Sequence, residues 1–230
     1  MVEVYPTATS HSYSDMCHVF RVRAGTAAFR LTGWGLRTFQ RRSRNTMITI
    51  LKTLIQPKLD YCSHLYSPTK EEHINKIESV QRDFTSHIIG FKDLDYWSRL
   101  TQLRLFSQER RRERYILIFL WKISQGKVKG YDIKFVSSDR RGRYAVPKLV
   151  CRSAPSNVRR AREGSLGVRG AMLFNLLPAH IRDSNVTSVE AFKVLLDTYL
   201  QTVPDQPTVS GLTRAAETNS LIHQIPLVPF

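Results

Sequence analysis

The fold of this chain is decided by residues 107–121, which read SQERRRERYILIFLW. Ser107 is a good helix N-cap, and Glu109 in the first turn is favoured by the positive end of the helix dipole. Arginines then fill the first half of the helix, whereas residues 115–121 are apolar on every side. A helix that is apolar all round is buried all round. The stretch therefore predicts a helix whose second half lies at the centre of the core.

Two amphipathic helices are predicted before this stretch, near the N-terminus. Apolar residues recur at three- and four-residue steps over residues 15–33, and Gly33 and Gly35 then weaken and end the helix. Asn45 is a good N-cap for a second helix that buries an apolar face. Pro57 kinks or breaks this helix, because proline lacks an amide hydrogen and its ring clashes with the preceding turn.

Residues 69–103 predict two further helices, each with a clear start signal. Thr69 and Glu72 form a capping box, in which each residue satisfies an exposed amide donor, and Gly90 ends this helix. Asp95 caps a short helix that reaches about Leu103. One face of the longer helix is apolar and is expected to be buried: Ile74, Ile77, Val80, Phe84 and Ile88.

Helical periodicity is lost after the central helix. Residues 126–170 are rich in Gly, Ser, Pro and Arg, and residues 144–150 predict a short β-hairpin with residues 166–168. A second capping box, Thr187 and Glu190, predicts a last helix, and the chain beyond it is predicted to be a flexible tail. The expected fold class is therefore mainly α, followed by a smaller irregular α+β region.

The charge balance favours a polyanionic partner. The chain has 230 residues, with 35 Lys and Arg against 19 Asp and Glu, a net charge of +16 and a pI near 10.2. Such a field attracts nucleic acid first and an acidic membrane surface second, with a merely soluble basic protein as the plain alternative. Residues 101–170 carry 18 basic and 5 acidic side chains. We therefore expect the polyanion-facing surface mainly in the middle of the chain.

Several other site classes find no support in the sequence. The cysteines, at positions 17, 62 and 151, lack metal-ligand spacing, so we predict no zinc site, no disulfide framework and no cofactor. The longest apolar run has seven residues, which excludes a membrane span on length, and no secretory signal is recognisable. The chain is therefore expected inside the cell, where its basic runs are compatible with nuclear entry. Without paired aspartates or another catalytic motif, no catalysis by this chain alone is expected.

Clusters of arginine are the candidate binding residues, because guanidinium forks match phosphate geometry. The candidate nucleic-acid-binding residues are Arg37, Arg41, Arg42, Arg44, Arg110, Arg111, Arg112, Arg114, Arg140, Arg141 and Arg143. In the alternative interpretation, Glu109 and Glu113 pair with some of these arginines at helical spacing and leave only a solvated face. Trp34, Trp97 and Trp121 are expected to pack in the core rather than to stack on bases.

A series of sequence blocks resembles one known protein family. The blocks are GWGLRTF (33–39), LIQPKLDYCSHLY (54–66), IESVQRDFTSHI (77–88), LDYWSRL (94–100), SQERRRERY (107–115), WKI (121–123), LFNLLPAHI (173–181), QTVPDQP (201–207) and NSLIHQ (219–224). Their order and spacing resemble the region that follows the polymerase palm in jockey-like, LINE-type non-LTR retrotransposon reverse transcriptases. The resemblance covers roughly residues 13–224.

The resemblance implies a thumb-like helical bundle, which we expect over residues 13–125. The residue pattern predicts a basic irregular region with a hairpin and a C-terminal helix over residues 126–202, and a flexible tail over residues 203–230. Thumbs of this family grip the primer–template duplex through its backbone. The implied partners are RNA or an RNA–DNA duplex, bound through phosphates, and a polymerase palm acting in trans. The palm itself, with its catalytic carboxylates, is missing from this chain, so polymerase activity is not expected.

A second hypothesis stays open beside nucleic-acid binding. In this hypothesis the chain is a helical protein–protein interaction module derived from the same element. An apolar face that once docked on the palm would then bind another protein or a second copy of the chain. Neither hypothesis involves a membrane.

Overall fold

The computed structural model describes residues 26–61, 63, 68, 71–128, 164–182, 185–207 and 219–225. Residues 26–38 are helical. The remaining elements follow in this order: α2 (Arg44–Ile50), the π-helical segment η1 (Leu51–Ile55), α3 (Gln56–Asp60), α4 (Glu71–Ser86), α5 (Tyr96–Leu103), α6 (Gln108–Ser124), the π-helical segment η3 (Leu166–Gly170), α8 (Ala171–Leu176), α9 (Ala179–Arg182), α10 (Val189–Thr202) and α11 (Leu221–Gln224). The described residues contain no strand, so the predicted mainly α fold class is confirmed.

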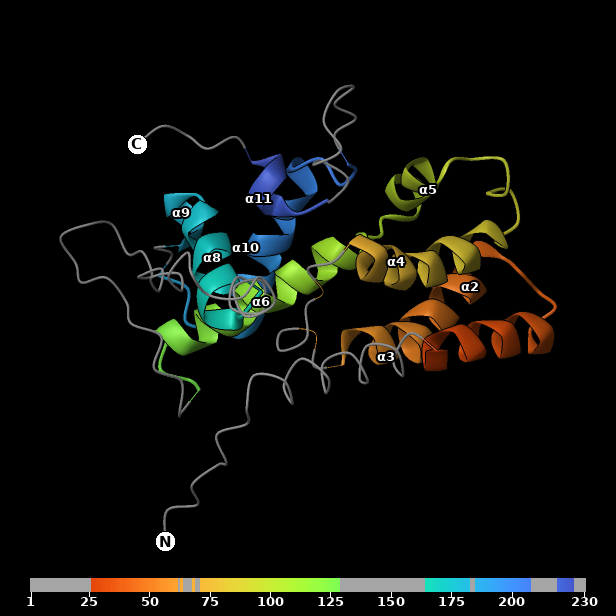
Figure 1. Cartoon of the computed structure of the whole chain (residues 1–230), viewed down its shortest axis with the longest axis horizontal. Coiled ribbons are helices and arrows are strands. Elements are labelled where there is room, and N and C mark those ends of the chain that lie inside the picture. The colour runs from red at the N-terminus through yellow and green to blue at the C-terminus, as the bar shows by residue number, and fades with distance from the viewer. Residues whose placement is uncertain are drawn as a thin grey trace, which may run out of the picture.

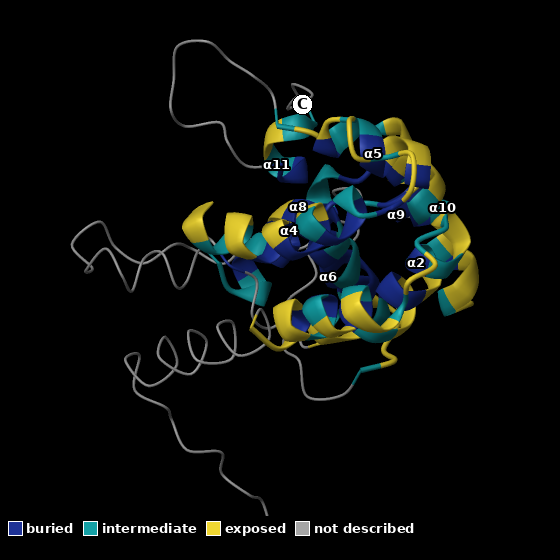
Figure 2. Cartoon of the chain, turned by 90° about the vertical axis from the view of Figure 1, so that its right-hand side faces the viewer, coloured by how far each residue is buried: buried dark blue, intermediate teal, exposed yellow. Residues whose placement is uncertain are grey.

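Helix α6 lies at the centre of the structure, and the other helices are arranged around it (Figures 1 and 2). It packs against α3, α4, η3, α8 and α10. In Figure 1 the helices that precede α6 lie to its right, α8 and α9 lie above its left-hand part, and α10 and α11 lie above its middle. In Figure 2 the buried stretches of the helices, in dark blue, lie toward this centre, and the exposed stretches, in yellow, lie on the outside of the surrounding helices.

Two apolar cores flank the first half of α6. The N-terminal core comprises Ala28, Met47, Ile50, Leu51, Ile55, Leu59, Ile77, Val80, Phe84, Ile88, Tyr96, Leu100, Leu103 and Leu105. The C-terminal core comprises Ile116, Leu117, Ile118, Leu120, Trp121, Ala171, Leu173, Phe174, Leu177, Ile181, Phe192, Leu196, Leu200 and Leu221. The apolar half of α6 belongs to the C-terminal core. The last helix of the predicted bundle over residues 13–125 therefore shares its apolar half with later segments of the chain.

The predicted burial of the apolar run in α6 is confirmed. Ile116, Leu117 and Leu120 are at most 1% exposed. Trp121 stacks on Phe192 of α10, with ring centroids 4.7 Å apart and an interplanar angle of 11°. This stacked contact between large aromatic rings joins α10 to the C-terminal end of α6.

The N-terminal helices differ from their predicted boundaries. The first helix continues through Gly33 and Gly35 to residue 38. A Cβ at Gly35 would lie 3.6 Å from Ile50 Cγ2, an ordinary contact distance, so this side of the helix packs against α2. The second helix begins after Ser43 rather than Asn45, with the Ser43 hydroxyl accepting from the Thr46 amide. At Pro57 the helix does not stop, since α3 continues to Asp60, and the π-helical η1 directly precedes α3.

The local signals for α4, α5 and α6 are confirmed where the structure describes them. Asp95 accepts hydrogen bonds from the Trp97 and Ser98 amides, each at 3.0 Å, and Ser107 accepts from the Arg110 amide at 3.1 Å. Gly90 has the positive φ of 83° that a stop signal requires. The Thr69 half of the first capping box lies outside the described residues.

Three predictions for the C-terminal part are wrong. Residues 166–168 belong to the π-helical η3, so they form no strand, and their predicted hairpin partner at 144–150 lies outside the described residues. Glu190 does not close a capping box, because its carboxylate binds Lys193 at 3.0 Å instead. Residues 219–225, predicted as part of a flexible tail, contain α11 and the buried Leu221.

No described helix combines the length and the apolar character needed to cross a membrane.

A close approach between η3 and α6 leads to a stability prediction. A Cβ added at Gly170 would lie 2.9 Å from Leu120 Cδ1 and 3.4 Å from Ile116 Cγ2, both in the closed C-terminal core. We expect Gly170→Ala to lower the free energy of unfolding by about 1–3 kcal/mol, because overpacking a filled core displaces side chains from their preferred rotamers. Urea unfolding followed by circular dichroism measures this change.

The control for this prediction is Gly33→Ala, also within a helical segment. There the added Cβ would meet only the Arg37 guanidinium, at an ordinary 3.5 Å. Removing a helix-interior glycine should leave the stability unchanged or raise it by about 0.5–1 kcal/mol. Equal stability of the two variants would contradict the proposed close packing at Gly170.

Candidate nucleic-acid interface

The arginines of α6 do not form an exposed cationic face. Arg110 is fully buried, and its Nη2 donates to the Pro204 carbonyl at 2.8 Å. Arg112 is 6% exposed and donates to the Leu59 carbonyl at the end of α3, at 3.0 Å. A phosphate group cannot reach either guanidinium in this fold. The predicted contacts of Arg110 and Arg112 with nucleic acid therefore find no support in this arrangement.

Arg111 and Arg114 are partly exposed, but each is paired within the protein. Arg111 Nη2 lies 2.5 Å from Asp60 Oδ2 at the end of α3. Arg114 forms a two-pronged pair with Asp197 of α10, one contact of which is 2.8 Å long. Such fork-to-carboxylate pairs hold two elements in a fixed orientation. These arginines fasten α3 and α10 to α6, and a phosphate would have to displace a carboxylate to bind them.

The alternative interpretation of the α6 sequence named Glu109 and Glu113 as the partners, and the structure gives them others. Glu113 accepts from the Ser220 hydroxyl at 2.5 Å and from the Leu221 amide at 2.8 Å, so it caps the start of α11. Arg169 of η3 lies 2.9 Å from Glu113 and 3.7 Å from Glu109. The acidic side chains of α6 thus bind later segments rather than the arginines beside them.

Two carboxylates from other elements accept the amide hydrogens at the start of α6. Glu78 of α4 accepts from the Gln108 amide, at 2.9 Å to its nearer oxygen. Asp205 accepts from the Ser107 amide at 2.7 Å and from the Ser107 hydroxyl at 2.8 Å. Negative charge is favoured at this end of a helix because its amides are unpaired and its dipole is positive there. These contacts join α4 and the segment after α10 at one point.

Burial shifts the titration of this polar cluster. Burial raises the pKa of Glu78 to about 7, although hydrogen bonds from Tyr96 and from the Gln108 amide oppose the shift. Burial also raises the pKa of Glu109 to about 7, with the nearby Glu113 adding to the effect and Arg169 opposing it. The pKa of Tyr96 is raised by its burial and by its contact with Glu78. Glu78 and Glu109 therefore stay protonated in the folded state at pH values where an unfolded glutamate is ionised.

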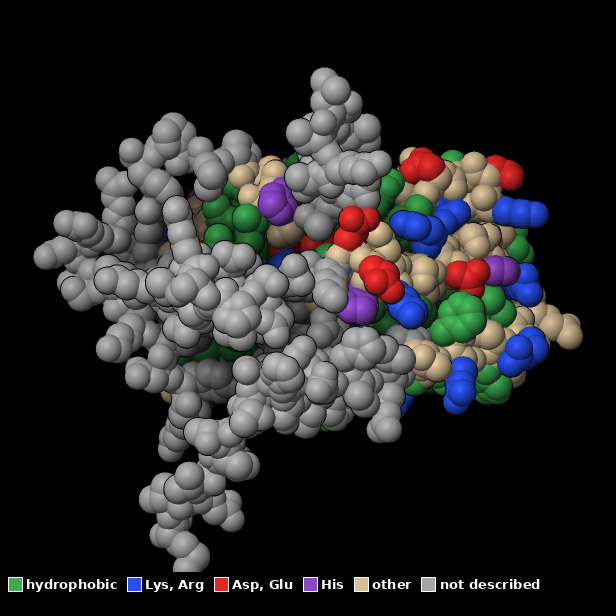
Figure 3. All heavy atoms as spheres, in the orientation of Figure 1, with side chains coloured by type: hydrophobic (Ala, Val, Ile, Leu, Met, Phe, Trp, Pro, Cys, Tyr) green, Lys and Arg blue, Asp and Glu red, His purple; other side chains and the backbone are tan. Residues whose placement is uncertain are grey.

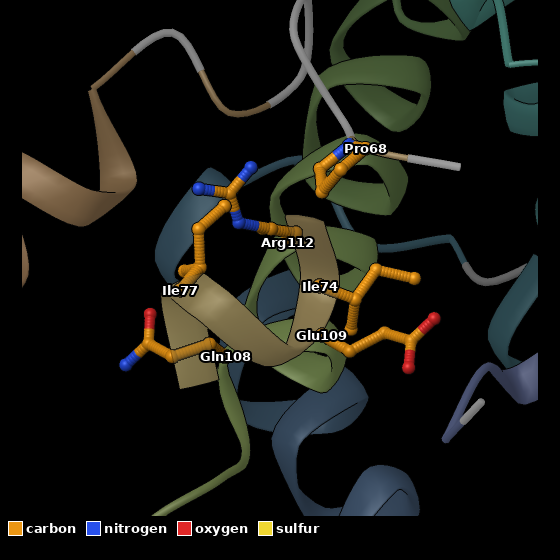
Figure 4. A pocket seen from close by; sticks show the side chains of 6 residues that line it. All are labelled: Pro68, Ile74, Ile77, Gln108, Glu109 and Arg112. Carbon is orange, nitrogen blue, oxygen red and sulfur yellow. The ribbon is translucent and has the colours of Figure 1, made fainter. Parts of the chain in front are cut away.

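The hollows near these residues do not resemble a substrate site. A cavity of about 10 Å³ is lined by Pro68, Ile74, Ile77, Gln108, Glu109 and Arg112 (Figure 4). The Glu109 and Arg112 side chains extend away from each other in this view, and the space would hold about one water molecule. A groove of about 260 Å³ is lined by Trp97, Leu100, Thr101, Leu105, Pro204, Asp205 and Gln206. Asp205 already serves as the acceptor for Ser107.

Positive charge that no acidic neighbour in the sequence offsets is instead found in residues 26–59, which we call the cationic arm. The arm contains no Asp or Glu. Its cations are Arg30, Arg37, Arg41, Arg42, Arg44, Lys52 and Lys58. No ion pair within the described part of the chain involves any of them. Figure 3 shows Lys and Arg side chains along the right-hand end of the molecule, where Figure 1 places the arm and α5.

The four arginines predicted in this region differ in their hydrogen bonds and in their exposure to solvent. Arg42 donates to the Leu36 carbonyl at 3.4 Å, and Arg44 donates to the Gln102 carbonyl at 2.7 Å, so both reach carbonyls near helix C-termini. Arg37 and Arg41 are exposed. Arg30, which the sequence reasoning missed, is exposed as well and lies seven residues before Arg37, on the same helix face. Helical spacing from Arg37 was the signal that could have found it.

Trp34 contradicts the prediction that all three tryptophans serve the core. Trp121 is 1% exposed, and Trp97 packs against the N-terminal core, but Trp34 is 46% exposed. Its ring meets Phe39 edge-on, at 5.9 Å between centroids and 88° between planes. Phe29 on the same helix is 58% exposed. The arm therefore presents aromatic surface beside its arginines.

The remaining predicted residues, Arg140, Arg141 and Arg143, lie outside the described residues. Among the residues that are described, no group of three or more His, Cys, Asp or Glu side chains is arranged to hold a metal ion. No family model, curated protein or solved structure matches this chain.

The raised pKa values of Glu78 and Glu109 lead to a prediction about pH. Between about pH 4.5, where an unfolded glutamate titrates, and about pH 7, the folded state holds protons that the unfolded state has lost. Raising the pH through this range therefore favours unfolding. We expect the free energy of unfolding to fall by at most a few kcal/mol from about pH 5 to about pH 7.5, as urea titrations would measure.

Two single variants assign this pH dependence. Glu78→Gln keeps an oxygen acceptor for the Gln108 amide but cannot titrate, so its stability should change less with pH. Glu190→Gln removes an exposed carboxylate whose pKa is lowered by Lys193, and it should follow the wild-type curve in this range. If Glu78→Gln also follows the wild-type curve, Glu78 does not titrate as described.

Proposed function

We propose that this chain binds nucleic acid through the cationic arm, holds the phosphates of RNA or an RNA–DNA duplex, and carries out no catalytic step of its own. The observation that carries the proposal is an acid-free stretch with seven Lys and Arg residues and no ion pair among the described residues. Arg30, Arg37 and Arg41 are exposed on it. The resemblance to the thumb of LINE-type reverse transcriptases leads to the same class of partner.

Electrostatics favours phosphate over other anions at such a surface. An arginine that lacks an internal carboxylate partner keeps its guanidinium fork available for the bidentate geometry of a phosphate. Several such groups on one element follow the spacing of a nucleic-acid backbone without reading its sequence. Binding then releases condensed counterions and weakens strongly as salt is added. The net charge of +16 adds a long-range attraction.

The α6 arginines support this function indirectly in our proposal. Arg111 and Arg112 contact Asp60 and the Leu59 carbonyl, which lie at the C-terminal end of the arm's last helix. They anchor the arm to the centre of the protein. A cationic surface fixed in one orientation loses less conformational entropy on binding than a mobile one does. Their role is thus to position the arm rather than to touch the ligand.

The wider setting follows from the resemblance alone. We propose that the chain derives from the thumb and post-polymerase region of a non-LTR retrotransposon reverse transcriptase and works inside the cell, with the nucleus as the expected site. A polymerase palm acting in trans is the proposed protein partner. The absence of a paired-aspartate motif in the sequence is the reason for assigning no nucleotidyl transfer to it.

Fluorescence anisotropy with a labelled RNA–DNA duplex tests the proposed phosphate contacts. We expect the affinity of the full chain to fall steeply between about 50 mM and about 200 mM salt. Arg37→Gln combined with Arg41→Gln should weaken binding. It should also reduce the slope of log affinity against log salt by about 2, because each phosphate contact contributes about one unit.

A matched control removes the same charge elsewhere. Lys122→Gln with Lys193→Gln takes two positive charges from α6 and α10, outside the arm. This control should keep the wild-type salt slope to within a few tenths, because only contacting charges release counterions. An equal loss in both double variants would reject a localised interface, and salt-independent binding would reject the electrostatic mechanism.

A further inference from the structure

We propose that Trp34 is a stacking platform for an unpaired base, so that the cationic arm binds single-stranded nucleic acid more tightly than a duplex of equal charge. This inference rests on the proposed function and names the form of nucleic acid that the same surface prefers. It depends on an observation that phosphate binding by itself does not explain. A large exposed aromatic ring lies between two exposed arginines.

Helical spacing places the ring and the arginines on one face. Arg30, Trp34 and Arg37 stand at positions i, i+4 and i+7 of the helix over residues 26–38, so their side chains are neighbours on its surface. The opposite face carries Ala28, Thr32 and Gly35, which are buried. The helix is therefore oriented with its packing side inward, and the Arg–Trp–Arg face is directed outward.

The exposure of Trp34 is unusual for its residue type. Tryptophan is the largest side chain and is highly buried on average, yet 46% of Trp34 is exposed beside cationic groups. Phe39 contacts the indole edge-on, with the ring planes at 88°, and holds it at the surface. A ring held in this way loses little rotamer freedom when a flat ligand stacks on it.

The Arg37 guanidinium lies beside Gly33, the residue that precedes Trp34. A Cβ at this position would lie 3.5 Å from Arg37 Nη1 and 3.9 Å from Arg37 Nη2. The Arg37 guanidinium therefore lies along the helix surface, over the residue that precedes Trp34. A nucleotide whose base stacks on the indole can direct its phosphate to this guanidinium.

The occupant that fits these features is a single-stranded polynucleotide. In a duplex both faces of an internal base are covered by its neighbours, whereas an unpaired base offers a free face to an aromatic side chain. Every base has such a face, so stacking requires no particular sequence. The absence of Asp and Glu throughout the arm excludes repulsion of the phosphates by the arm itself.

Binding of the full chain to four probes tests the inference. The probes are a single-stranded RNA of about 12 nucleotides, an abasic sugar–phosphate strand of the same length, an RNA–DNA duplex, and vesicles that contain an anionic lipid. For Trp34→Leu we expect a loss of affinity of about 5- to 150-fold toward the single strand, the range for one lost stacking contact. Affinity for the abasic strand and for the duplex should not change.

Two further variants control for ring loss and for folding. Trp34→Phe keeps an aromatic face and should retain most of the affinity for the single strand. Tyr61→Leu removes another ring, 70% exposed and outside the Arg–Trp–Arg face, and should bind as the wild type does. Addition of the single strand should quench tryptophan fluorescence in the wild type, and this quenching should be lost in Trp34→Leu. If Trp34→Leu does not fold, Trp34→Phe and the wild-type quenching decide the question.

The failure of this inference differs from the failure of the proposed function. If Trp34→Leu binds the single strand as the wild type does, while Arg37→Gln with Arg41→Gln weakens duplex binding, the stacking platform is rejected and phosphate binding stands. If the wild type binds none of the nucleic-acid probes, both proposals fail. A loss in Trp34→Leu that is confined to anionic vesicles would overturn the inference and assign the face to membranes.

Discussion

Charged side chains at the start of α6 are removed from water, and the surrounding elements supply hydrogen-bond partners for some of their atoms, such as Arg110 Nη2. Arg110 and Glu113 are both fully buried. An ion buried without partners costs several kcal/mol, whereas one with well-placed hydrogen bonds recovers most of that cost. The partners come from α3, α4, η3, α10, α11 and residues 204–205. Polar geometry therefore specifies which elements surround α6, and apolar burial alone would allow other arrangements.

Local signals in the sequence predicted much of the fold, whereas contacts between distant residues could not be predicted. The Asp95 and Ser107 caps and the buried run 115–121 depend on neighbours within one helical turn or on composition. The pairing of Arg114 with Asp197 joins residues 83 positions apart. A run of arginines looks the same in the sequence whether or not distant carboxylates pair with its side chains. For this reason the predicted site included buried arginines. The core assignment of Trp34 rested on residue type, because large aromatic side chains mostly serve packing, and its exposure departs from that tendency.

The position of the charged surface follows from where the acidic residues lie. Counting along the chain placed the excess of positive charge in residues 101–170. In the described part of that range, arginines such as Arg110 are buried or paired. Residues 26–59 carry fewer cations, but no acidic side chain lies among them to neutralise their field. A surface potential therefore depends on the exposed charges and their pairing, which net charge along a sequence does not report.

The hydrogen bonds by which Glu113 caps α11 also constrain when, during synthesis, the protein can finish folding. Glu113 and Ser220 are 107 residues apart, and Glu109 receives the Asn219 amide across 110 residues. Closing so long a loop is slow compared with forming a helix. During translation the carboxylates of α6 leave the ribosome long before the amides that will bind them. The centre of the molecule must therefore remain hydrated until residue 221 has been synthesised, and the nascent chain reaches its final packing only at that late point.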